Sequence, residues 1–464
     1  MTTLNKHFTL PFTPHDFQEE GIAQIVKMRC SLLKYSVGLG KTLTATCAAL
    51  QLSLDKGVEQ ILILCPPILM DQWAEWLQSV KGIPDVLVYR GSPTERAAMD
   101  LDTSVIICSY NVFRGTKKLT ADHSRFKALA KKRKLCIIAD ELSLKNLSSQ
   151  TYRKLKMMLY GKMRTVAGDV SAHYLIALNA TPVSDLGQIY NWLAMMQPGT
   201  YVSKNLFEFA HVAKSDHWGA VLEWRNEDLL SDNFSTICVD TDKEIKLPPL
   251  VETVIPYILG KKHLKLYEEV KEAELNNLPE DKIELAINSM FSTLQRLVLL
   301  PREFGLDIES PVLDFIYGYL DQMSPDAGVL IYTRHVLVSQ MLAEKIPDSV
   351  AIYGGVPKNY REEAFSKLKS GECKRLVGNI ESLGVGLNLP MLNHVIYVEL
   401  PYRDDKLIQS TGRIHRQGQQ KTCFAVYPLA KETIQQQIYY KLLKNQEDLF
   451  KYLRSKTDIA EFLK

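Results

Sequence analysis

The chain has 464 residues, of which 46% are hydrophobic and 23% are charged. This length predicts two or three domains, and the composition is ordinary for a soluble globular protein with large buried cores. The formal net charge of +3 is nearly balanced, which excludes a strongly basic protein that binds nucleic acid through its overall positive charge. Any contact with nucleic acid must therefore come from a local arrangement of basic and polar groups.

Eight cysteines lie along the chain without a Cys-x-x-Cys pair, most of them inside apolar runs. This distribution favours reduced, buried side chains over a zinc site or a disulfide framework. The N-terminal sequence MTTLNKHFTLPFTP lacks the apolar core of a signal peptide, and no apolar run is long enough to span a bilayer. We therefore expect a soluble protein that has no membrane partner and lives in a reducing compartment.

Short apolar runs rich in Ile, Val and Leu alternate with helical patterns along the chain. Continuous apolar strands separated by helices are typical of parallel sheets covered on both faces. The predicted strands are 31–36, 61–67, 105–110, 135–141 and 174–182 in a first set, and 328–333, 349–355, 375–380, 394–400 and 423–429 in a second. The sequence therefore predicts an α/β fold with two parallel-sheet domains in tandem.

Residues 201–305 differ from the rest because they are helical in pattern, charged and poor in apolar strand runs. Within them, 247–258 (LPPLVETVIPYI) is expected to form an extended segment that crosses from one domain to the other. We therefore place a first domain at 1–200, a helical protrusion with the crossing segment at 201–305, and a second domain at 306–464. Apolar residues recur at helical spacing in 432–453 and predict a final helix that packs back on the body.

A glycine-rich turn, SVGLGKT, follows the first predicted strand. A helix that begins with Gly-Lys-Thr directly after a strand presents backbone N–H groups and the positive end of its dipole to phosphates. Lys41 would then bind the β- and γ-phosphates of a nucleotide, and the Thr42 hydroxyl would hold magnesium. Gly38 and Gly40 complete the predicted nucleotide-binding loop. Tyr35 stands where the full Walker consensus has glycine, so a purely structural turn remains an alternative for this motif taken alone.

Two carboxylates end the apolar run LCIIADE, the fourth predicted strand of the first set. A strand end is where a P-loop ATPase places the Asp that faces magnesium, which predicts that role for Asp140. Glu141 follows and is placed to orient and deprotonate the attacking water. A solvated acidic strand end is the plainer alternative. Upstream, Gln18 lies just before the first amphipathic helix, where it could read an adenine edge or be a surface glutamine.

The segment QSTGRIHRQGQ, in the second half of the chain, supplies cations suited to phosphoryl transfer. Arg413 and Arg416 are three residues apart and would share one face of a helix. Guanidinium groups suit the charge that develops on a transferring γ-phosphoryl group, and such arginine fingers contribute about 10³–10⁵-fold in rate. A basic surface helix is the alternative. Just upstream, NIESLGVGLNL places Gly384 and Gly386 in a turn suited to close contact with phosphate or DNA backbone.

Taken together, these motifs resemble those of the superfamily-two helicase-like ATPases, and within them the Swi/Snf-type DNA translocases. GLGKT, DE, NATP, GVGLNL and Q-x-x-GR-x-HR-x-GQ occur in the order of that family over nearly the whole chain. The ending HRQGQ is the most specific element, because most strand-separating relatives lack its Gly-Gln. Pro66, Pro67 and Trp73 match a further family motif, as does LPPLVETV, whereas Tyr402 replaces a usual Trp.

The resemblance implies two RecA-like lobes with a helical insertion between them, and a site in which both lobes bind one ATP with magnesium. It assigns to this site Gln18, Gly40, Lys41, Thr42, Asp140, Glu141, Gly384, Gly386, Gln409, Arg413 and Arg416. Loops after predicted strands also supply candidate contacts to DNA phosphates, which do not read sequence. These candidates are Trp73, Ser109, Tyr110, Arg114, Thr181, Thr333, Arg334 and Ser382. The basic run 127–134 reads more simply as a helix end.

Two motifs depart from the family pattern. The usual Asp-Glu-Ala-His reads DELS here, so Ser143 stands in place of the histidine that links the ATP site to other motifs. The usual Gly-Thr-Pro reads NATP, with Thr181 retained and expected to couple the nucleotide to the DNA groove. These departures leave the catalytic pair intact and put the coupling in question.

We interpret the chain as a minimal DNA translocase, monomeric on DNA and without the reader and DNA-spacing domains of chromatin-directed relatives. It would hydrolyse ATP to move along double-stranded DNA, and a motor of this kind could remodel protein–DNA complexes or branched DNA. Two alternatives stay open: a strand-separating helicase acting on DNA or RNA, and a nucleic-acid-binding scaffold with an inactive ATP site. The expected location is the cytoplasm of a bacterium or of a virus-infected host cell, or wherever DNA is held.

Overall fold

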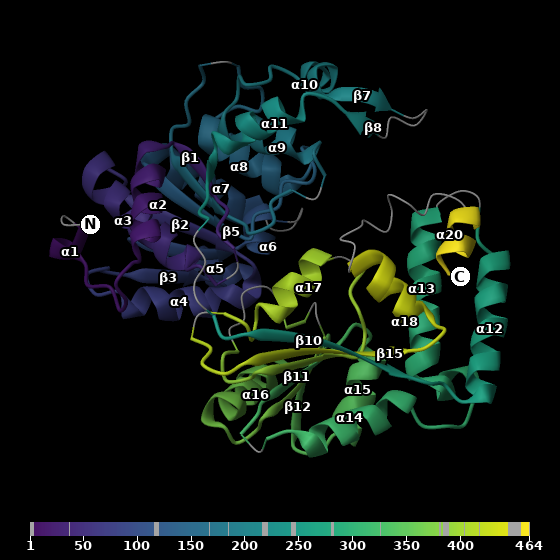
Figure 1. Ribbon diagram of the computed structural model, residues 1–464. Helices are drawn as coiled ribbons and strands as arrows, with labels where there is room; N and C mark the ends of the chain where they lie inside the picture. The colour runs from purple at the N-terminus through teal and green to yellow at the C-terminus, as the bar shows by residue number, and fades with distance from the viewer. Residues whose placement is uncertain are drawn as a thin grey trace. The chain divides into compact units, whose positions relative to one another are not determined.

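The computed structural model of the protein describes most of the chain. The described residues are 4–36, 38–115, 120–166, 168–183, 185–215, 221–242, 247–279, 283–324, 326–379, 382–383, 389–402, 404–416, 418–443 and 456–463. The chain divides into two compact units, Met1–Glu244 and Ile245–Lys464, and each is built around one large sheet (Figure 1). They are called the first and the second unit below.

The first unit contains a seven-stranded parallel sheet in the order β3-β4-β2-β5-β6-β1-β9. Its strands are β1 Cys30–Leu33, β2 Gln60–Cys65, β3 Val86–Tyr89, β4 Val105–Ser109, β5 Leu135–Asp140, β6 Tyr174–Leu178 and β9 Cys238–Val239. Every residue of the five strands between β3 and β9 is buried. Burial on both faces is what their continuous runs of Ile, Leu and Val predict.

Helices cover this sheet, and a small antiparallel hairpin lies beside two of them (Figure 1). The helices are α1 Leu4–His7, α2 Asp16–Lys27, α3 Lys41–Lys56, α4 Met70–Ser79, α5 Pro93–Ala98, α6 Tyr110–Arg114, α7 Thr120–Lys132, α8 Gln150–Tyr160, α9 Gln188–Met196, α10 Lys204–His211 and α11 Glu227–Ser235, with a 3-10 turn at Pro67–Leu69. The hairpin consists of β7 Val212–Ser215 and β8 Val221–Trp224. The basic run 127–134 contains the C-terminal end of α7, with Lys131 and Lys132 in the last turn, where cations are favourable.

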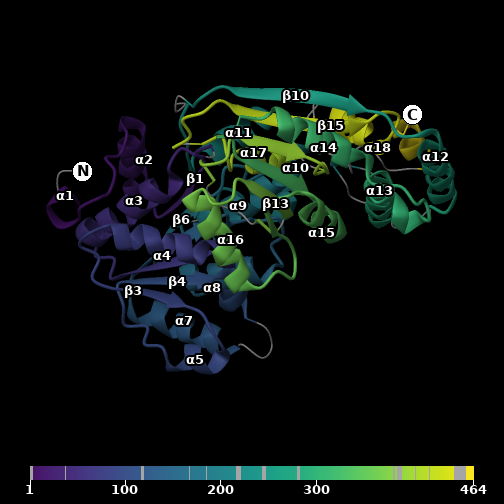
Figure 2. The same cartoon turned by 90° about the horizontal axis from the view of Figure 1, so that it is seen from below.

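The second unit contains a six-stranded parallel sheet in the order β10-β15-β14-β11-β13-β12. Its strands are β10 Leu250–Tyr257, β11 Val329–Thr333, β12 Ser349–Ile352, β13 Arg375–Asn379, β14 His394–Tyr397 and β15 Cys423–Ala430. Figure 2 shows β10 and β15 running side by side, and their backbones pair over eight residues. The edge strand β10 is half-exposed, whereas the strands inside the sheet are almost fully buried.

Helices also pack on the second sheet, and α12, α13 and α20 stand together at one side of it (Figure 1). The helices are α12 Lys261–Asn276, α13 Ile283–Leu299, α14 Pro311–Gln322, α15 Val336–Lys345, α16 Lys358–Ser370, α17 Asp404–Thr411, α18 Ile434–Gln437 and α20 Lys456–Phe462, with a 3-10 turn at Pro301–Phe304 and a π-helical turn at Ile438–Leu443. In the predicted final helix, Ile434 and Ile438 are buried as expected. Leu449 lies outside the described residues.

The predicted α/β fold with two RecA-like parallel-sheet lobes is confirmed, and each of the ten predicted strands is present. Sequence analysis did not predict β3, β9 or the β7–β8 hairpin. These strands are short, and three of the four residues of β3 are only half-buried, so none of them produces a long apolar run. Their pattern resembles that of ordinary loop or helix sequence.

The structure divides residues 201–305 between the two units, whereas sequence analysis expected a separate helical segment there. Strand β9 pairs with β1 and therefore belongs to the first sheet. The segment 247–258 is extended as expected, but it contains β10, a full strand of the second sheet. The boundary between compact units consequently lies near residue 244.

The eight cysteines all lie in the described part of the chain as free thiols, seven of them buried and Cys238 half-buried. Burial raises the pKa of Cys30 and of Cys47 to about 12, which suppresses their reactive thiolate form. Over the residues that the structure describes, no helix has the length and apolar character needed to cross a membrane.

A buried ion pair joins α5 and α7 in the first unit. Arg96 and Asp122 are only 4% and 6% exposed in their side chains, and Nη2 lies 2.9 Å from Oδ2. Asp122 also accepts from Nε of Arg96 at 3.1 Å and from the Tyr89 hydroxyl at 2.6 Å. Burial alone would raise the pKa of Asp122, but the bonds from Arg96 and Tyr89 lower it below its usual value.

Candidate functional site

The loop that is predicted to bind phosphate, called the phosphate loop below, joins β1 to α3 and is shaped by two left-handed glycines. Gly38 has φ 91° and Gly40 has φ 75°, a conformation that residues with a side chain rarely adopt. Gly40 also lacks room for a side chain, because a Cβ there would lie 2.4 Å from an amide nitrogen on α2. The Lys41 ammonium donates to the carbonyl oxygens of Tyr35 at 2.9 Å and of Ser36 at 3.2 Å. The loop thus curls around a cation at the N-terminus of a 16-residue helix, a geometry suited to phosphate.

Tyr35 explains why this loop departs from the Walker consensus. Its side chain is fully buried, and its hydroxyl donates to the backbone carbonyl of Phe17 on α2 at 2.9 Å. The side chain fits against Gly21, where an added Cβ would come within 2.0 Å of the hydroxyl oxygen. The bulky residue at this position therefore joins the phosphate loop to α2.

Gln18 makes a second link between α2 and the loop. Its side chain is buried, Nε2 donates to the carbonyl oxygen of Leu39 at 2.9 Å, and Oε1 accepts from the backbone N–H of His15 at 2.9 Å. A glutamine amide has two N–H groups and two acceptor positions, so these bonds leave capacity for a further contact. Contact with adenine stays a prediction, and the geometry adds that α2 and the phosphate loop are held as one piece.

Gly21→Ala is expected to weaken ATP binding about tenfold, because a methyl group that close to Tyr35 must push the loop away from α2. The double variant Gly21→Ala/Tyr35→Phe removes the clashing oxygen together with its bond to the Phe17 carbonyl, so it should recover part of the affinity. Gly318→Ala is the matched control, since a Cβ there meets no described atom within 4 Å. Titration with a fluorescent ATP analogue compares the variants, and unchanged binding by Gly21→Ala would contradict the link.

Asp140 ends β5 and is held by two aromatic side chains. The indole N–H of Trp73 donates to Oδ2 at 2.9 Å, and the Tyr110 hydroxyl donates to the backbone carbonyl of Asp140 at 2.9 Å. Burial raises the pKa of Asp140 above its usual value, and the bond from Trp73 and the positive charge of Lys41 offset only part of that rise. The carboxylate is therefore fixed in orientation and interacts with the charge of the phosphate-loop lysine.

The residues near Lys41 fit a magnesium ion that is bound together with phosphates. Magnesium prefers oxygen ligands and usually takes one or two carboxylates plus substrate phosphates. Asp140 supplies one buried carboxylate, and Thr42 supplies a hydroxyl at the start of α3. Across the described ranges, no group of three or more His, Cys, Asp and Glu side chains could hold a metal by itself. This donor set matches a metal that shares its ligands with a nucleotide.

Glu141 has φ 53°, which is a left-handed conformation with a backbone cost for a residue that carries a side chain. The residues after it depart from the family pattern, yet Leu142 and Leu144 are each only 1% exposed and pack in the core of the first unit. The chain after Glu141 is therefore anchored in the core by Leu142, inside the DELS segment, and by Leu144, directly after it.

In the second unit, the arginines of QSTGRIHRQGQ do not share a helical face. Helix α17 carries Gln409 but ends at Thr411, and Gly412 begins a series of turns that contains Arg413 and Arg416. Arg413 is buried, and its carbonyl oxygen accepts from the backbone N–H of Leu389 at 3.0 Å. Burial, with the charge of Arg413, lowers the pKa of Arg416 to about 10, which leaves it cationic at neutral pH.

Gln419 is the last residue of HRQGQ, the motif that is most specific for the family. In the structure its side chain supports a turn. Its Nε2 donates to the carbonyl oxygens of Leu392 at 2.9 Å and Ile414 at 3.0 Å. Its Oε1 accepts from the backbone N–H groups of Gln420 at 3.0 Å and Lys421 at 2.9 Å. These four bonds close the turn that carries the two arginines, so the Gly-Gln signal in HRQGQ marks the support of that turn.

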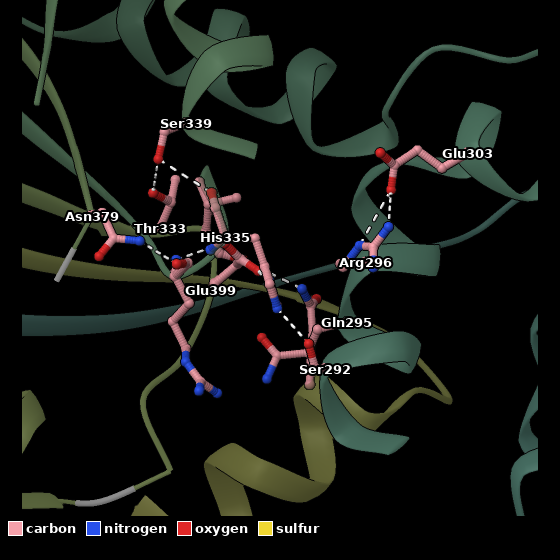
Figure 3. Close-up of polar contacts among 12 residues, drawn as sticks. Ser292, Gln295, Arg296, Glu303, Thr333, His335, Ser339, Asn379 and Glu399 are labelled. Carbon is pink, nitrogen blue, oxygen red and sulfur yellow. Dashed lines mark hydrogen bonds and ion pairs between the residues drawn. The ribbon is translucent and has the colours of Figure 1, made fainter. Parts of the chain in front are cut away.

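A polar network at the ends of β11 and β14 holds Thr333, the last residue of β11, and the turn that follows it at Arg334 (Figure 3). Glu399 is fully buried, and its Oε2 accepts from the backbone N–H groups of Arg334 at 2.6 Å and His335 at 2.9 Å. His335 bonds to Glu399 through Nδ1 and to the Ser292 hydroxyl through Nε2, the latter at 2.6 Å. Sequence reasoning missed this network because its members come from separate elements.

Asn379 brings two candidate DNA contacts together at the end of β13. Its Nδ2 donates to the carbonyl oxygen of Arg334, and its Oδ1 accepts from the Ser382 N–H at 3.4 Å. The Arg334 guanidinium lies over the ring of Tyr402, 3.7 Å from the ring centroid. Tyr402 thus provides the aromatic surface at the position of the usual Trp. The predicted residues Gly384 and Gly386 lie outside the described residues.

Burial separates the candidate DNA contacts into two groups. Trp73, Ser109 and Thr333 are buried, whereas Tyr110, Arg114, Arg334 and Ser382 are half-buried and Thr181 is exposed. Ser109 accepts from the Val112 N–H at 3.4 Å as the cap of α6. The buried group therefore has contacts that shape loops, while the second group has surface available to a ligand.

Residues 17–303 match the family model described as SNF2-related domain. The chain belongs to the SNF2-related family. Residues 312–418 match the model described as helicase conserved C-terminal domain. The protein is thus an ATP-dependent, helicase-like ATPase whose SNF2-related core is followed by a helicase C-terminal domain in the second unit.

Relatives of this SNF2-related chain match nearly all of it at low identity. The ATP-dependent helicase YqhH of Bacillus subtilis is 24% identical, with 96% of this chain and 80% of the relative covered. An ATP-dependent helicase of Mycoplasma pneumoniae is 23% identical over 97% of this chain and 43% of its own length. Chromodomain-helicase-DNA-binding protein 1-like of Danio rerio is 21% identical over 88% and 40%. The chain therefore spans less than half the length of these last two relatives.

Among solved structures, the chain is similar to the SWI2/SNF2 ATPase core of Sulfolobus solfataricus in complex with dsDNA. The two chains are 20% identical, with 98% of this chain and 96% of the other covered and a TM-score of 0.42.

Proposed function

We propose that this SNF2-related ATPase hydrolyses ATP between its two lobes and uses the reaction to move along double-stranded DNA as a monomer. The observation that carries the proposal is the arrangement of strand ends in the first unit. The phosphate loop after β1 and Asp140 at the end of β5 flank β6 in the sheet, and the charge of Lys41 acts on the Asp140 carboxyl group. The name of the Danio rerio relative supports DNA as the partner.

ATP would bind with its phosphates on the loop that starts α3. The Lys41 ammonium would hold the β- and γ-phosphates, with Gly38 and Gly40 leaving the backbone open to them. Gln18 would contact the adenine edge. Thr42 and Asp140 would hold magnesium, which neutralises charge on the phosphates when it is bound.

Hydrolysis would need groups from both units. Glu141 would accept the proton of the attacking water. Arg413 and Arg416 would stabilise the charge on the transferring γ-phosphoryl group, completed by Gln409 and by the turn that contains Gly384 and Gly386. Because each unit would supply a different part of the site, ATP binding would draw the units together and product release would let them part.

The half-buried and exposed candidates would contact DNA phosphates, which gives binding without sequence preference. They are Tyr110, Arg114, Thr181, Arg334 and Ser382. Trp73, Ser109 and Thr333 would act from inside by holding these loops. Alternate closing and opening of the units would then shift one set of contacts along the strand.

The test is ATP turnover measured in parallel with no nucleic acid, duplex DNA, single-stranded DNA and RNA. We expect duplex DNA to give the largest stimulation, and displacement of a third strand from a DNA triplex without separation of the duplex. Strongest stimulation by RNA, or duplex unwinding without triplex displacement, would favour a strand-separating helicase. DNA binding with no ATP turnover under any condition would favour an inactive scaffold.

A further inference from the structure

Asn179 is a buried polar residue at the end of β6 that joins three strand ends of the first unit. It is 7% exposed, and its backbone N–H donates to the carbonyl oxygen of Leu33 at the end of β1 at 3.3 Å. Its Nδ2 donates to the carbonyl oxygen of Leu142 at 2.7 Å, and its Oδ1 accepts from the Thr181 N–H at 2.8 Å. One residue therefore links the phosphate-loop strand, the segment after the carboxylates and the Thr181 loop.

The Leu142 carbonyl belongs to the second peptide group after the strained residue Glu141, the one that joins Leu142 to Ser143. A left-handed residue with a side chain costs on the order of 1–3 kcal/mol and persists only where its surroundings hold it. Here the surroundings are the buried Leu142 side chain and the bond from Asn179. A buried carbonyl that lost this bond would be left without its donor, which gives the bond a structural consequence at Glu141.

Asn191 makes a comparable bond from a different place. It lies on α9, is 6% exposed, and its Nδ2 donates to the carbonyl oxygen of Leu144 at 2.7 Å. This bond holds the same segment two residues further along the chain, and it comes from a helix and not from the Thr181 loop. Asn179 and Asn191 therefore donate hydrogen bonds of equal length to two carbonyl oxygens of the same segment. The carbonyl bound by Asn179 is one residue after Glu141, and the one bound by Asn191 is three residues after it.

We propose that Asn179 is a positioning residue for ATP hydrolysis. By holding the Leu142 carbonyl it sets the backbone of Glu141, and by holding the Thr181 N–H it ties that backbone to a loop with an exposed side chain. A displacement of the Thr181 loop would pass through a single carboxamide to the Glu141 carboxylate. This inference rests on the proposed function, in which Glu141 activates the attacking water.

Asn179→Ala is expected to lower kcat for DNA-stimulated ATP hydrolysis about 10–100-fold, because a small displacement of a catalytic group has an effect of this size. The KM for ATP should stay within about threefold, since the bonds of the phosphate loop to α2 do not involve Asn179. Asn179→Asp keeps an acceptor for Thr181 but loses the donor to Leu142, so it should behave like Asn179→Ala. Asn191→Ala is the matched control and should retain most of kcat.

Thermal unfolding separates positioning from folding. Asn179→Ala removes two side-chain bonds and Asn191→Ala removes one, so the first variant should lose somewhat more stability, and kcat is compared at a temperature at which both variants are folded. Equal losses of kcat in the two variants would overturn the inference. Hydrogen exchange without nucleotide gives a second test, in which the Thr181 amide should exchange faster in Asn179→Ala and not in Asn191→Ala. Unchanged exchange would overturn this inference alone, whereas absence of ATP turnover by the wild type would remove the proposed function and the catalytic part of the inference together.

Discussion

Glu141→Gln is expected to lower DNA-stimulated ATP hydrolysis by about 10²–10⁴-fold, the usual contribution of a general base. Glutamine has nearly the same size and keeps the position of the side chain, but it cannot accept a proton from water. The left-handed backbone of residue 141 and the buried leucines after it should not change, because they depend on the main chain and the core. ATP should therefore still bind. Phosphate release measures turnover, and titration with an ATP analogue measures binding.

Two further variants serve as a control and a comparison for Glu141→Gln. Glu75→Gln, on the exposed side of α4, removes the same charge in the same unit and should leave turnover unchanged. Lys41→Ala should lose ATP binding as well as turnover, because it removes the cation around which the phosphate loop curls. Turnover by Glu141→Gln close to that of the wild type would contradict the role of Glu141 as the base.

Arg96→Met is expected to lower the free energy of unfolding of the first unit by about 3–5 kcal/mol, since it leaves a buried carboxylate without its partner. The double variant Arg96→Met/Asp122→Asn removes the stranded charge and keeps an acceptor for the Tyr89 hydroxyl, so it should recover part of the loss. Urea unfolding followed by circular dichroism measures each variant.

Arg133→Met provides the comparison for that ion pair. Arg133 pairs with Asp102, but the side chains are 28% and 69% exposed, and an exposed pair contributes about 1 kcal/mol or less. A loss in Arg96→Met no larger than in Arg133→Met would show that the buried pair is not the stabilising feature.

The stabilisation by Asp122 should also depend on pH. Because the folded-state pKa of Asp122 is lowered, its contribution to the free energy of unfolding is present at neutral pH and is lost as the pH falls through that pKa. The difference between wild type and Arg96→Met should therefore shrink in acid.

The parts of the site that the sequence predicted are those made by contiguous residues. The geometry of a strand followed by Gly-Lys-Thr, or of a buried strand that ends in Asp-Glu, is determined by residues that are adjacent in the sequence. The local backbone agrees with both patterns, since left-handed Gly38 and Gly40 precede Lys41 at the start of α3 and Asp140 ends β5, while the roles of these residues in ATP hydrolysis stay predictions. The same holds for the strands inside the two sheets, since burial on both faces requires an unbroken apolar run.

The parts that the sequence did not predict depend on partners from distant segments. In the sequence, Tyr35 is a departure from the consensus of the phosphate loop. In the structure, Gly21 leaves room for the Tyr35 side chain. Ser143 replaces the histidine that links the ATP site to other motifs in the family. In the structure, the neighbouring carbonyl of Leu142 is instead bound by Asn179, which follows β6. The expected helical face of Arg413 and Arg416 was wrong because Gly412 and the turns after it end the helix at Thr411. Side-chain pairing across a fold leaves little periodic signal along the chain.

The pairing of β10 with β15 constrains how the second unit is made on the ribosome. Strand β10 is the first strand of that unit to be synthesised, yet it lies at the edge of the sheet and its neighbour is the last strand to emerge. Contacts between such distant segments form slowly, so nascent β10 must wait with its backbone exposed while the rest of the unit is translated. An incomplete chain that stops before Cys423 would present this strand to other chains, which makes premature termination an aggregation hazard.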